Sequence, residues 1–283
     1  MDKVIGLGHT GCGIADEFLQ YPEYRIYKIG SPIAGDRANL DISPQPHIEA
    51  YEAEADPVEI SSYLRSIRDD DEVLFLVPGG EPISGLTLVI LEQISHAKVT
   101  VVYVIPDLSL ANEIQKRDNK IVFNVLQEYA RSGLLTCLFL IDRSQVEEIV
   151  GDVSIREFDK SVYNLIAHVV AMVNYYDHVD PVLSNKIPPH KISRIGTFGI
   201  SSLEEGAEKK YLFNLDKEKD AHYYYGIPQQ QLDDSSTLLR DIKAQTKKFI
   251  GEGINGSFSV YSTTFDNLMV LFTAYSKEIQ KVP

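Results

Sequence analysis

The sequence predicts an α/β fold in which a parallel, Rossmann-like sheet is followed by one long central helix and a smaller α+β domain. Three observations support this prediction. Apolar strand segments alternate with helical segments through the first half of the chain, as expected for a parallel sheet covered on both faces. Residues 154–175 carry apolar side chains at the spacing of a helix. Beyond residue 190, strand segments outnumber helical ones.

The first half of the chain supplies the sheet. Residues 3–7 form a short apolar run, and residues 24–29 alternate at the period of a strand. The expected strands are 3–7, 24–29, 72–77, 99–105 and 134–141, and the expected helices are 14–20, 58–68, 86–95 and 110–132. Residues 30–57 are rich in Pro, Asp and Gly, which predicts a long loop with little regular structure.

The second half begins with the central helix at 154–175. After a Pro-bearing loop at 177–189, strands are expected at 192–201, 211–215, 257–262 and 267–275, with a helix at 236–250. We therefore expect three parts: an α/β domain at 1–152, the central helix at 153–176, and a smaller α+β domain at 177–283.

Composition and charge exclude some partners. The 283 residues carry a formal net charge of −14, a field that repels nucleic-acid backbones, so we expect no nucleic-acid groove. No apolar stretch approaches the roughly 18 residues of a membrane helix, and the N-terminus lacks a signal-peptide pattern. The 2 cysteines make no disulfide framework. These features favour a soluble cytoplasmic protein without a membrane partner.

Residues 6–15 hold the strongest candidate for a binding site. Four glycines, Gly6, Gly8, Gly11 and Gly13, fall between the first strand and the start of a helix. Glycine lets backbone N–H groups approach an anion closely, and the N-terminus of the helix adds unpaired donors. The pattern therefore predicts a phosphate cradle, with a loop that only turns the chain as the alternative.

A dinucleotide is the first ligand to consider for a glycine-rich strand–helix junction. NAD-binding folds place an acid at the end of the second strand, where it bonds the ribose. Here that strand ends in Tyr27-Lys28-Ile29-Gly30. The missing acid argues against a Rossmann-type NAD(P) protein.

A second glycine-rich segment, residues 78–85, follows the strand at 72–77 and opens a helix. Ligands of open α/β sheets bind in a crevice at the carboxyl ends of the strands. Because both glycine segments lie at such ends, we expect residues 6–15 and 78–85 to face one site.

The order of these motifs resembles the tubulin/FtsZ family. The first loop of tubulins reads G-Q-x-G-x-Q-I-G, and residues 8–15 are similar to it. The family's second loop, G-G-G-T-G-[ST]-G, is similar to residues 79–85, and the Pro-containing loop after its next strand resembles residues 101–106. Residues 185–192 resemble the N-L-V-P-Y-P-R-I of tubulin. The resemblance covers most of residues 3–200 in order.

Further motifs extend the resemblance. The E-G-K-K-R of FtsZ proteins, whose Glu and Arg approach the ribose and phosphates, is similar to residues 113–117. The base-contacting I-P-N-D region resembles residues 140–143. The L-L-D-A-F before the central helix resembles residues 155–159, which places Phe158 where the family stacks an aromatic ring on guanine. The N-x-D-x-x-[DE] loop, which completes the active site of the next subunit, resembles residues 175–180.

The resemblance implies a cytoskeletal protein that binds GTP with Mg²⁺ at a subunit junction and self-assembles head to tail into filaments, so that polymerisation would activate any GTPase activity. Asp177 and Asp180 are the candidate catalytic residues, which would orient a water and accept its proton. A solvated acidic turn at the end of a helix is another interpretation of this pair, and an alternative register puts His178, Asp180 and Leu183 on the motif, which loses the second acid. The candidate nucleotide-binding residues are Gly8, His9, Thr10, Gly11, Cys12, Gly79, Gly80, Ser84, Gly85, Glu113, Arg117, Arg143 and Phe158. The histidines show no paired spacing of a metal site.

The second loop departs from the family pattern, which keeps another interpretation open. Its central Gly-Thr-Gly is replaced by Glu81-Pro82-Ile83. Proline removes an N–H donor, and a carboxylate at residue 81 repels phosphates unless a cation intervenes. The base-reading Asn of the family's long helix falls at Val162. The alternative to a GTP-binding filament protein is a non-hydrolysing tubulin-like scaffold that has lost nucleotide binding.

Overall fold

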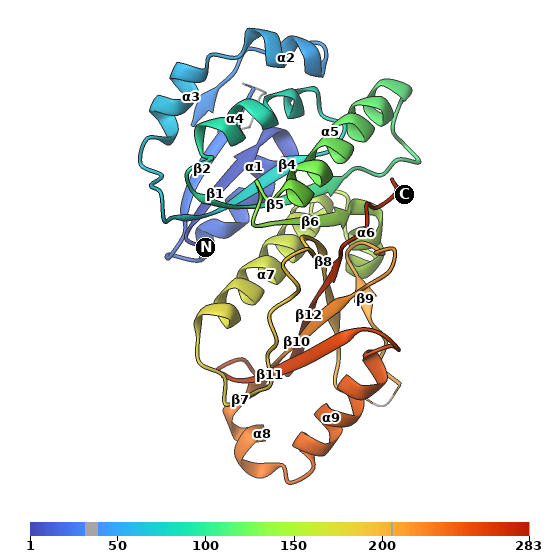
Figure 1. Cartoon of the computed structure of the whole chain (residues 1–283). Coiled ribbons are helices and arrows are strands. Elements are labelled where there is room, and N and C mark those ends of the chain that lie inside the picture. The colour runs from blue at the N-terminus through green and yellow to red at the C-terminus, as the bar shows by residue number, and fades with distance from the viewer. Residues whose placement is uncertain (32–38, 205, 283) are drawn as a thin grey trace. The chain divides into compact units, whose positions relative to one another are not determined.

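A computed structural model describes residues 1–31, 39–204 and 206–282. The chain separates into two compact units, Met1–His168 with Lys281–Pro283, and Val169–Gln280. Helix α7 (Phe158–His178) begins in the first unit and ends in the second (Figure 1). The three-part division at 152/153 and 176/177 stays a prediction.

The first unit is built on a parallel sheet with the strand order β3-β2-β1-β4-β5-β6. Its strands are β1 (Lys3–Leu7), β2 (Arg25–Gly30), β3 (Leu40–Asp41), β4 (Glu72–Pro78), β5 (Lys98–Ile105) and β6 (Cys137–Asp142). Val4 of β1 lies opposite Ile26 of β2 and Leu74 of β4. Residues 73–78 of β4 are all buried, as expected for a strand with both faces covered. The predicted parallel sheet is confirmed.

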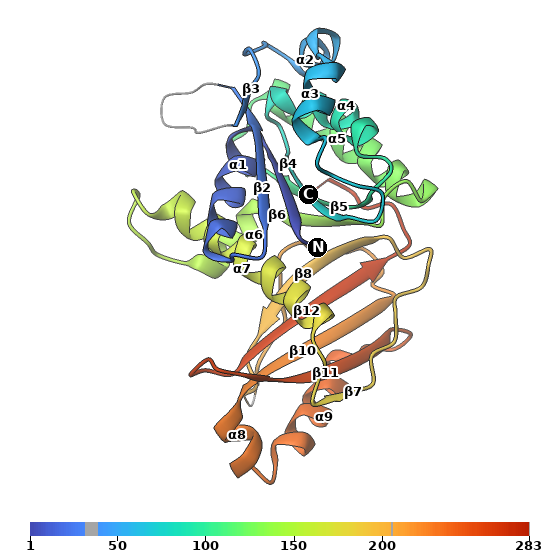
Figure 2. The same cartoon turned by 90° about the vertical axis from the view of Figure 1, so that its left-hand side faces the viewer.

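Helices cover both faces of this sheet, with α1 on one side and α3 and α4 on the other (Figure 2). The helical elements are α1 (Gly8–Glu17), η1 (Phe18–Gln20), α2 (Ile48–Glu54), α3 (Pro57–Leu64), η2 (Pro82–Leu86), α4 (Thr87–Gln93), α5 (Glu113–Ser132) and α6 (Arg143–Val150), of which η1 and η2 are 3₁₀ helices. Local signals fix several helix ends. Asp56 caps α3, and Asn112 forms a capping box with Gln115 at the start of α5.

The loop predicted at 30–57 needs correction, and one helix of this unit was not predicted. The loop predicted at 30–57 contains β3 and the two-turn helix α2, while residues 32–38 of that segment lie outside the described residues. Helix α2 forms because Ile48 and Tyr51 are buried on one side of it and the His47 side chain accepts a hydrogen bond from the amide of Ala50. Helix α6 was not expected, and the Asp142 side chain caps it through the amide of Ser144.

The second unit contains a mixed sheet with the order β8-β12-β10-β11-β7, and β9 pairs with β8. Its elements are β7 (Leu183–Ser184), β8 (Ile195–Ser201), β9 (Lys210–Tyr211), β10 (Asp220–Pro228), α8 (Gln229–Asp234), α9 (Leu238–Phe249), β11 (Asn255–Thr263) and β12 (Met269–Ser276). Strand β12 is antiparallel to β8 and β10, whereas β10 and β11 are parallel. The predicted α+β character is confirmed.

Strand β10 at the centre of this sheet was not predicted; a strand had been expected at 211–215, where only the two-residue β9 reaches Tyr211. Residues 220–227 of β10 are all buried, so they lack the alternation of a half-exposed strand. Tyr223 and Tyr225 join the cluster of Phe249, Phe258 and Phe272. Tyr223 and Tyr225 thus belong to this core cluster, and Tyr224 is buried as well.

No helix in the described ranges combines the length and the apolar character needed to cross a membrane.

Candidate functional site

The junction between β1 and α1 has no loop. Strand β1 ends at Leu7, and α1 begins at Gly8, so the glycine-rich segment forms the first turns of the helix. The sequence placed the helix start at Ile14, and that prediction is wrong because tertiary contacts outweigh the low helix propensity of glycine. The amide donors of a helix N-terminus therefore lie directly at the carboxyl end of β1.

The glycines of this segment allow close packing. A Cβ atom on Gly11 would lie 2.7 Å from the carbonyl oxygen of Leu76 in β4, and one on Gly6 would come within 3 Å of Ala15. Residues with side chains would push α1 off the sheet. The same glycines that predict a phosphate cradle thus also fix where α1 lies on β1 and β4.

An acidic side chain holds the N-terminus of α1. The carboxylate of Glu81 accepts hydrogen bonds from the amide of His9 at 2.8 Å (Oε2) and from the amide of Thr10 at 2.9 Å (Oε1). His9 and Thr10 are the second and third residues of the helix, and a capping side chain normally accepts a hydrogen bond from an amide at one of these positions. Leu7, at the N-cap position, makes no side-chain hydrogen bond. The two glycine segments are therefore joined as expected, but by a carboxylate.

The second glycine segment packs against neighbouring helices and strand β5. A Cβ atom on Gly79 would collide with Oδ1 of Asn119 in α5 and lie 2.9 Å from the hydroxyl of Tyr103 in β5, and Gly80 has a positive φ of 71°. Gly85 lies against the backbone of Ile48 in α2. Ser84 is buried, and its hydroxyl donates to the carbonyl oxygen of Glu81 at 2.7 Å. The side-chain donor expected from Ser84 is thus used within the turn.

The two candidate residues on α5 make ion pairs. Arg117 donates to Asp118 at 2.8 Å and lies 3.5 Å from Glu49 of α2. The hydrogen bond that Arg117 donates to Asp118 raises the pKa of Arg117. Glu113 is exposed and pairs with Lys116 at 3.2 Å. Asp118 has a fully buried side chain, so Arg117 supplies its counter-charge.

Arg143 lies in another cluster of charges, at the start of α6. Its Nε donates to Glu147 at 2.7 Å, and its guanidinium also pairs with Asp159. Burial alone would lower the pKa of Arg143, but the hydrogen bonds to Asp159 and Glu147 outweigh it and raise that pKa. Phe158, the first residue of α7, is partly buried beside Asp159.

Tyr163 of α7 connects this cluster to α1, and the sequence did not single it out. The guanidinium carbon of Arg143 lies 5.9 Å from the centre of the Tyr163 ring, and the ring of His9 meets it edge-on at 6.4 Å. A Cβ atom on Gly13 would lie 2.5 Å from Cε2 of Tyr163. The only available signal was its position one residue after Val162, where the family reads the base.

Cys12, the remaining candidate in the first segment, is buried. Its thiol lies 3.4 Å from the carbonyl oxygen of Gly6 and 3.5 Å from that of Ile29. It faces the sheet below α1.

The two candidate catalytic acids lie in the second unit. Asp177 is in the last turn of α7, where its Oδ1 pairs with Lys186 at 2.5 Å and accepts a hydrogen bond from the hydroxyl of Tyr224 at 2.9 Å. Asp180 lies beyond the helix and is exposed. The structure thus separates their environments, because Asp177 is tied to two partners within its own unit.

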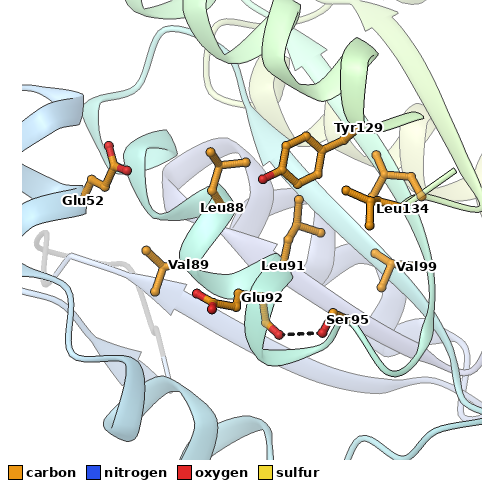
Figure 3. A pocket seen from close by; sticks show the side chains of 10 residues that line it. Glu52, Leu88, Val89, Leu91, Glu92, Ser95, Val99, Tyr129 and Leu134 are labelled. Atoms are coloured by element: carbon orange, nitrogen blue, oxygen red, sulfur yellow. Dashed lines mark hydrogen bonds between the residues drawn. The ribbon is translucent and has the colours of Figure 1, made fainter. Parts of the chain in front are cut away.

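A pocket in the first unit lies at a different edge of the sheet. Side chains from α2, α4 and α5 line it, among them Glu52, Leu88 and Tyr129 (Figure 3). Val99 near the start of β5 and Leu135 before β6 place it at the amino ends of the strands. Ligands of parallel sheets bind at the carboxyl ends, so the candidate site is the α1 junction.

The fold and this junction define an α/β protein in which a helix N-terminus holds an anionic group, the chain's own Glu81 carboxylate, at the carboxyl edge of a parallel sheet. The sequence matches no family model and no curated protein. Solved structures do match. An FtsZ dimer from M. jannaschii superposes with a TM-score of 0.72 at 14% identity, over 97% of this chain and 87% of that one.

Two further structures are similar to nearly the whole chain. CetZ2 from Haloferax volcanii, in a GTPγS-bound protofilament, gives a TM-score of 0.71 at 12% identity, over 99% of this chain and 95% of that one. TubZ from Bacillus thuringiensis serovar israelensis, in a GTPγS-form protofilament, gives 0.69 at 13% identity, over 100% and 88%. This chain therefore has the tubulin/FtsZ fold, as the ordered motifs predicted.

Proposed function

We propose that this chain is a self-assembling protein of the tubulin type that binds a nucleotide phosphate at the N-terminus of α1 and associates head to tail. One observation carries the proposal: the amides of His9 and Thr10 converge on a single anionic group at the carboxyl edge of the sheet. A helix N-terminus at this position is suited to a phosphate through both its amide donors and its dipole.

GTP with Mg²⁺ is the ligand we infer for this site. Support comes from the two similar structures whose descriptions name GTPγS. The first segment fits a phosphate, since two of its amides already hold a carboxylate. In the described ranges, no three acidic, histidine or cysteine side chains gather as a metal group. Mg²⁺ would take most of its ligands from phosphates and water.

Head-to-tail assembly is inferred from the same fold. The TubZ and CetZ2 structures are described as protofilaments, and TubZ also as a two-stranded filament. A heterologous contact of this kind repeats without closing and so builds a filament. In such a filament, Asp180 is the better placed of the two acids to orient a water for the neighbouring subunit's nucleotide, because Lys186 and Tyr224 already bind Asp177.

A nucleotide-free scaffold is the second candidate, and specific contacts favour it. The Glu81 carboxylate already accepts hydrogen bonds from the amides that a phosphate would use. Arg117 and Arg143 are both paired with carboxylates, so their charges are largely offset before any nucleotide arrives. Such a protein would assemble without GTP.

Nucleotide retention and light scattering test these candidates. Heat release from the purified full chain, followed by chromatography, shows whether guanine nucleotide is bound, and scattering is then recorded with Mg²⁺ and either GTP or ATP. GTP-dependent scattering with bound guanine nucleotide supports the first candidate. Scattering without any nucleotide supports the scaffold. A chain that neither binds nucleotide nor assembles contradicts both, and bound NAD(P) points to a dinucleotide protein.

A further inference from the structure

Helix α1 depends on a distant residue for its N-terminal cap. An uncapped helix leaves its first amides without acceptors, and a local Ser, Thr, Asp or Asn normally supplies one. Here the residue at the N-cap is Leu7, and the acceptor comes from Glu81, which is 71 positions beyond Thr10. The carboxylate divides its two oxygens between two adjacent amides.

We propose that Glu81 is an internal anion in the phosphate position of α1, so that an external phosphate binds this chain only by displacing the Glu81 carboxylate. The inference rests on the proposed function, since it concerns the same site. The contact between Glu81 and α1 keeps a ligand out of the site until the Glu81 side chain turns away.

The surroundings of Glu81 permit that exchange. Its backbone is fixed, because its carbonyl oxygen accepts hydrogen bonds from the amide of Ser84 at 3.0 Å and from the Ser84 hydroxyl at 2.7 Å. Its partly buried side chain reaches α1 through single bonds that can change between staggered rotamers. A Cβ atom on Gly8 would collide with Oε2 of Glu81, which shows that the carboxylate lies directly over the glycine. A rotamer change clears the site without moving the sheet.

Two anions cannot share these amides. A phosphate beside the Glu81 carboxylate would meet like charge at short range, and the amides offer no second set of donors. Binding of phosphate therefore carries the cost of breaking two charge-assisted hydrogen bonds. In return, the unliganded chain keeps α1 capped and the two glycine segments joined, which stabilises the fold without nucleotide.

Thermal unfolding in inorganic phosphate tests the exchange. Glu81→Ala removes the cap, and we expect the Tm in chloride buffer to fall by about 2–6 °C. Replacing chloride by inorganic phosphate at constant ionic strength should restore much of that loss, because phosphate then binds the free amides. The wild-type Tm should respond far less, since Glu81 competes.

Glu59→Ala is the matched control. Glu59 is an exposed acid in the first turn of α3, so its removal changes the net charge equally without uncapping α1. Its Tm should follow phosphate as the wild type does. Should Glu81→Ala not fold, Glu81→Gln, which keeps one oxygen acceptor, goes through the same titration. Variants at residue 81 that unfold like wild type, with no added response to phosphate, overturn the proposal.

Titration with Mg²⁺-GTP separates this inference from the proposed function. We expect Glu81→Ala to bind GTP roughly tenfold more tightly than wild type, because the competing cap is gone. If phosphate restores the Tm of Glu81→Ala but neither protein binds GTP, the internal anion is supported and the nucleotide proposal is refuted. Equal GTP affinity in both proteins, without phosphate rescue, refutes the internal anion and leaves nucleotide binding standing.

Discussion

The ring of Tyr163 lies so close to Gly13 that a Cβ atom on the glycine would be 2.5 Å from ring carbon Cε2. Tyr163 is 6% exposed and belongs to the α7 segment within the first unit. Packing at this contact fixes α1 against α7. A side chain at residue 13 must displace a buried aromatic ring.

We therefore expect Gly13→Ala to destabilise the first unit, although alanine favours a helix interior over glycine. Overpacking at such a contact costs about 1–3 kcal/mol, more than the roughly 1 kcal/mol gained in helix propensity. Chemical denaturation of the wild type and the variant measures the difference. In Tyr163→Ala the same glycine substitution should be neutral or stabilising; an equal loss in both backgrounds contradicts the contact.

The sequence predicted the parallel sheet because strands buried on both faces, such as β4, are continuously apolar. It could not predict the start of α1. Four glycines favour a loop locally, yet Gly8, Gly11 and Gly13 are helical, and the contacts that hold them come from Leu76 and Glu81, far along the chain. Strand β10 is also buried on both faces and so shows no alternation, but polar Asp220 and His222 interrupt the apolar run that marks β4. Its sequence therefore carries neither signal of a strand.

The sequence likewise predicts one part of the candidate site and not another. Proximity of residues 6–15 and 78–85 follows from strand order, so it was predictable. The partners of single side chains were not predictable. The ion pairs of Arg143 with Glu147 and Asp159, for example, depend on where α6 and α7 lie. Apart from its position next to Val162, Tyr163 gave no signal, since one tyrosine in an apolar helix resembles any core residue. The roles of the predicted site residues in nucleotide binding stay predictions.

Stability should fall in mild acid because of His222. This residue is 4% exposed, its Nδ1 lies 2.7 Å from Ser257 and its Nε2 lies 3.1 Å from Ser259. Burial, together with the charge of Lys186, lowers the pKa of His222 from 6.5 to about 3. The unfolded chain therefore takes up a proton below pH 6.5 that the folded chain refuses, and stability decreases as the pH falls from there.

The expected loss is about 1.5 kcal/mol between pH 6.5 and pH 5. Denaturation of wild type and His222→Gln across this range measures it, with the slope against pH as the readout. Carboxylates with lowered pKa, such as Asp220, act at lower pH in the same direction. Burial also lowers the pKa of His168, which adds to the slope, so His168→Gln serves as a parallel control. An unchanged slope in His222→Gln would show that His222 does not contribute.

Arg143 should stabilise the first unit whether or not nucleotide binds. Its side chain is 20% exposed and pairs with Glu147, which is 23% exposed. We expect Arg143→Ala to cost about 1–2 kcal/mol, because it leaves two carboxylates without their partner. In Glu147→Ala the same substitution should cost less, and a double-mutant cycle measures this coupling. Fully additive losses would show that the pair contributes no coupling energy.

Asp177 and Asp180 should respond differently to substitution. Asp177→Ala removes the ion pair with Lys186 at 2.5 Å and the acceptor of the Tyr224 hydroxyl, so we expect a loss of about 1 kcal/mol. Asp180 is exposed, and Asp180→Ala should change stability by less than about 0.5 kcal/mol. Denaturation of the two variants tests this contrast, and equal losses would contradict it.

The same pair of variants tests the catalytic proposal, because Lys186 forms its ion pair with Asp177 and not with Asp180. If assembly activates hydrolysis, Asp180→Ala should bind Mg²⁺-GTP and assemble as the wild type does, yet release phosphate at least about tenfold more slowly, since no carboxylate orients the water. Phosphate release per assembled subunit, with scattering recorded in parallel, measures this. Wild-type turnover by Asp180→Ala would remove Asp180 from the mechanism, and slower release caused by poorer assembly would show in the scattering.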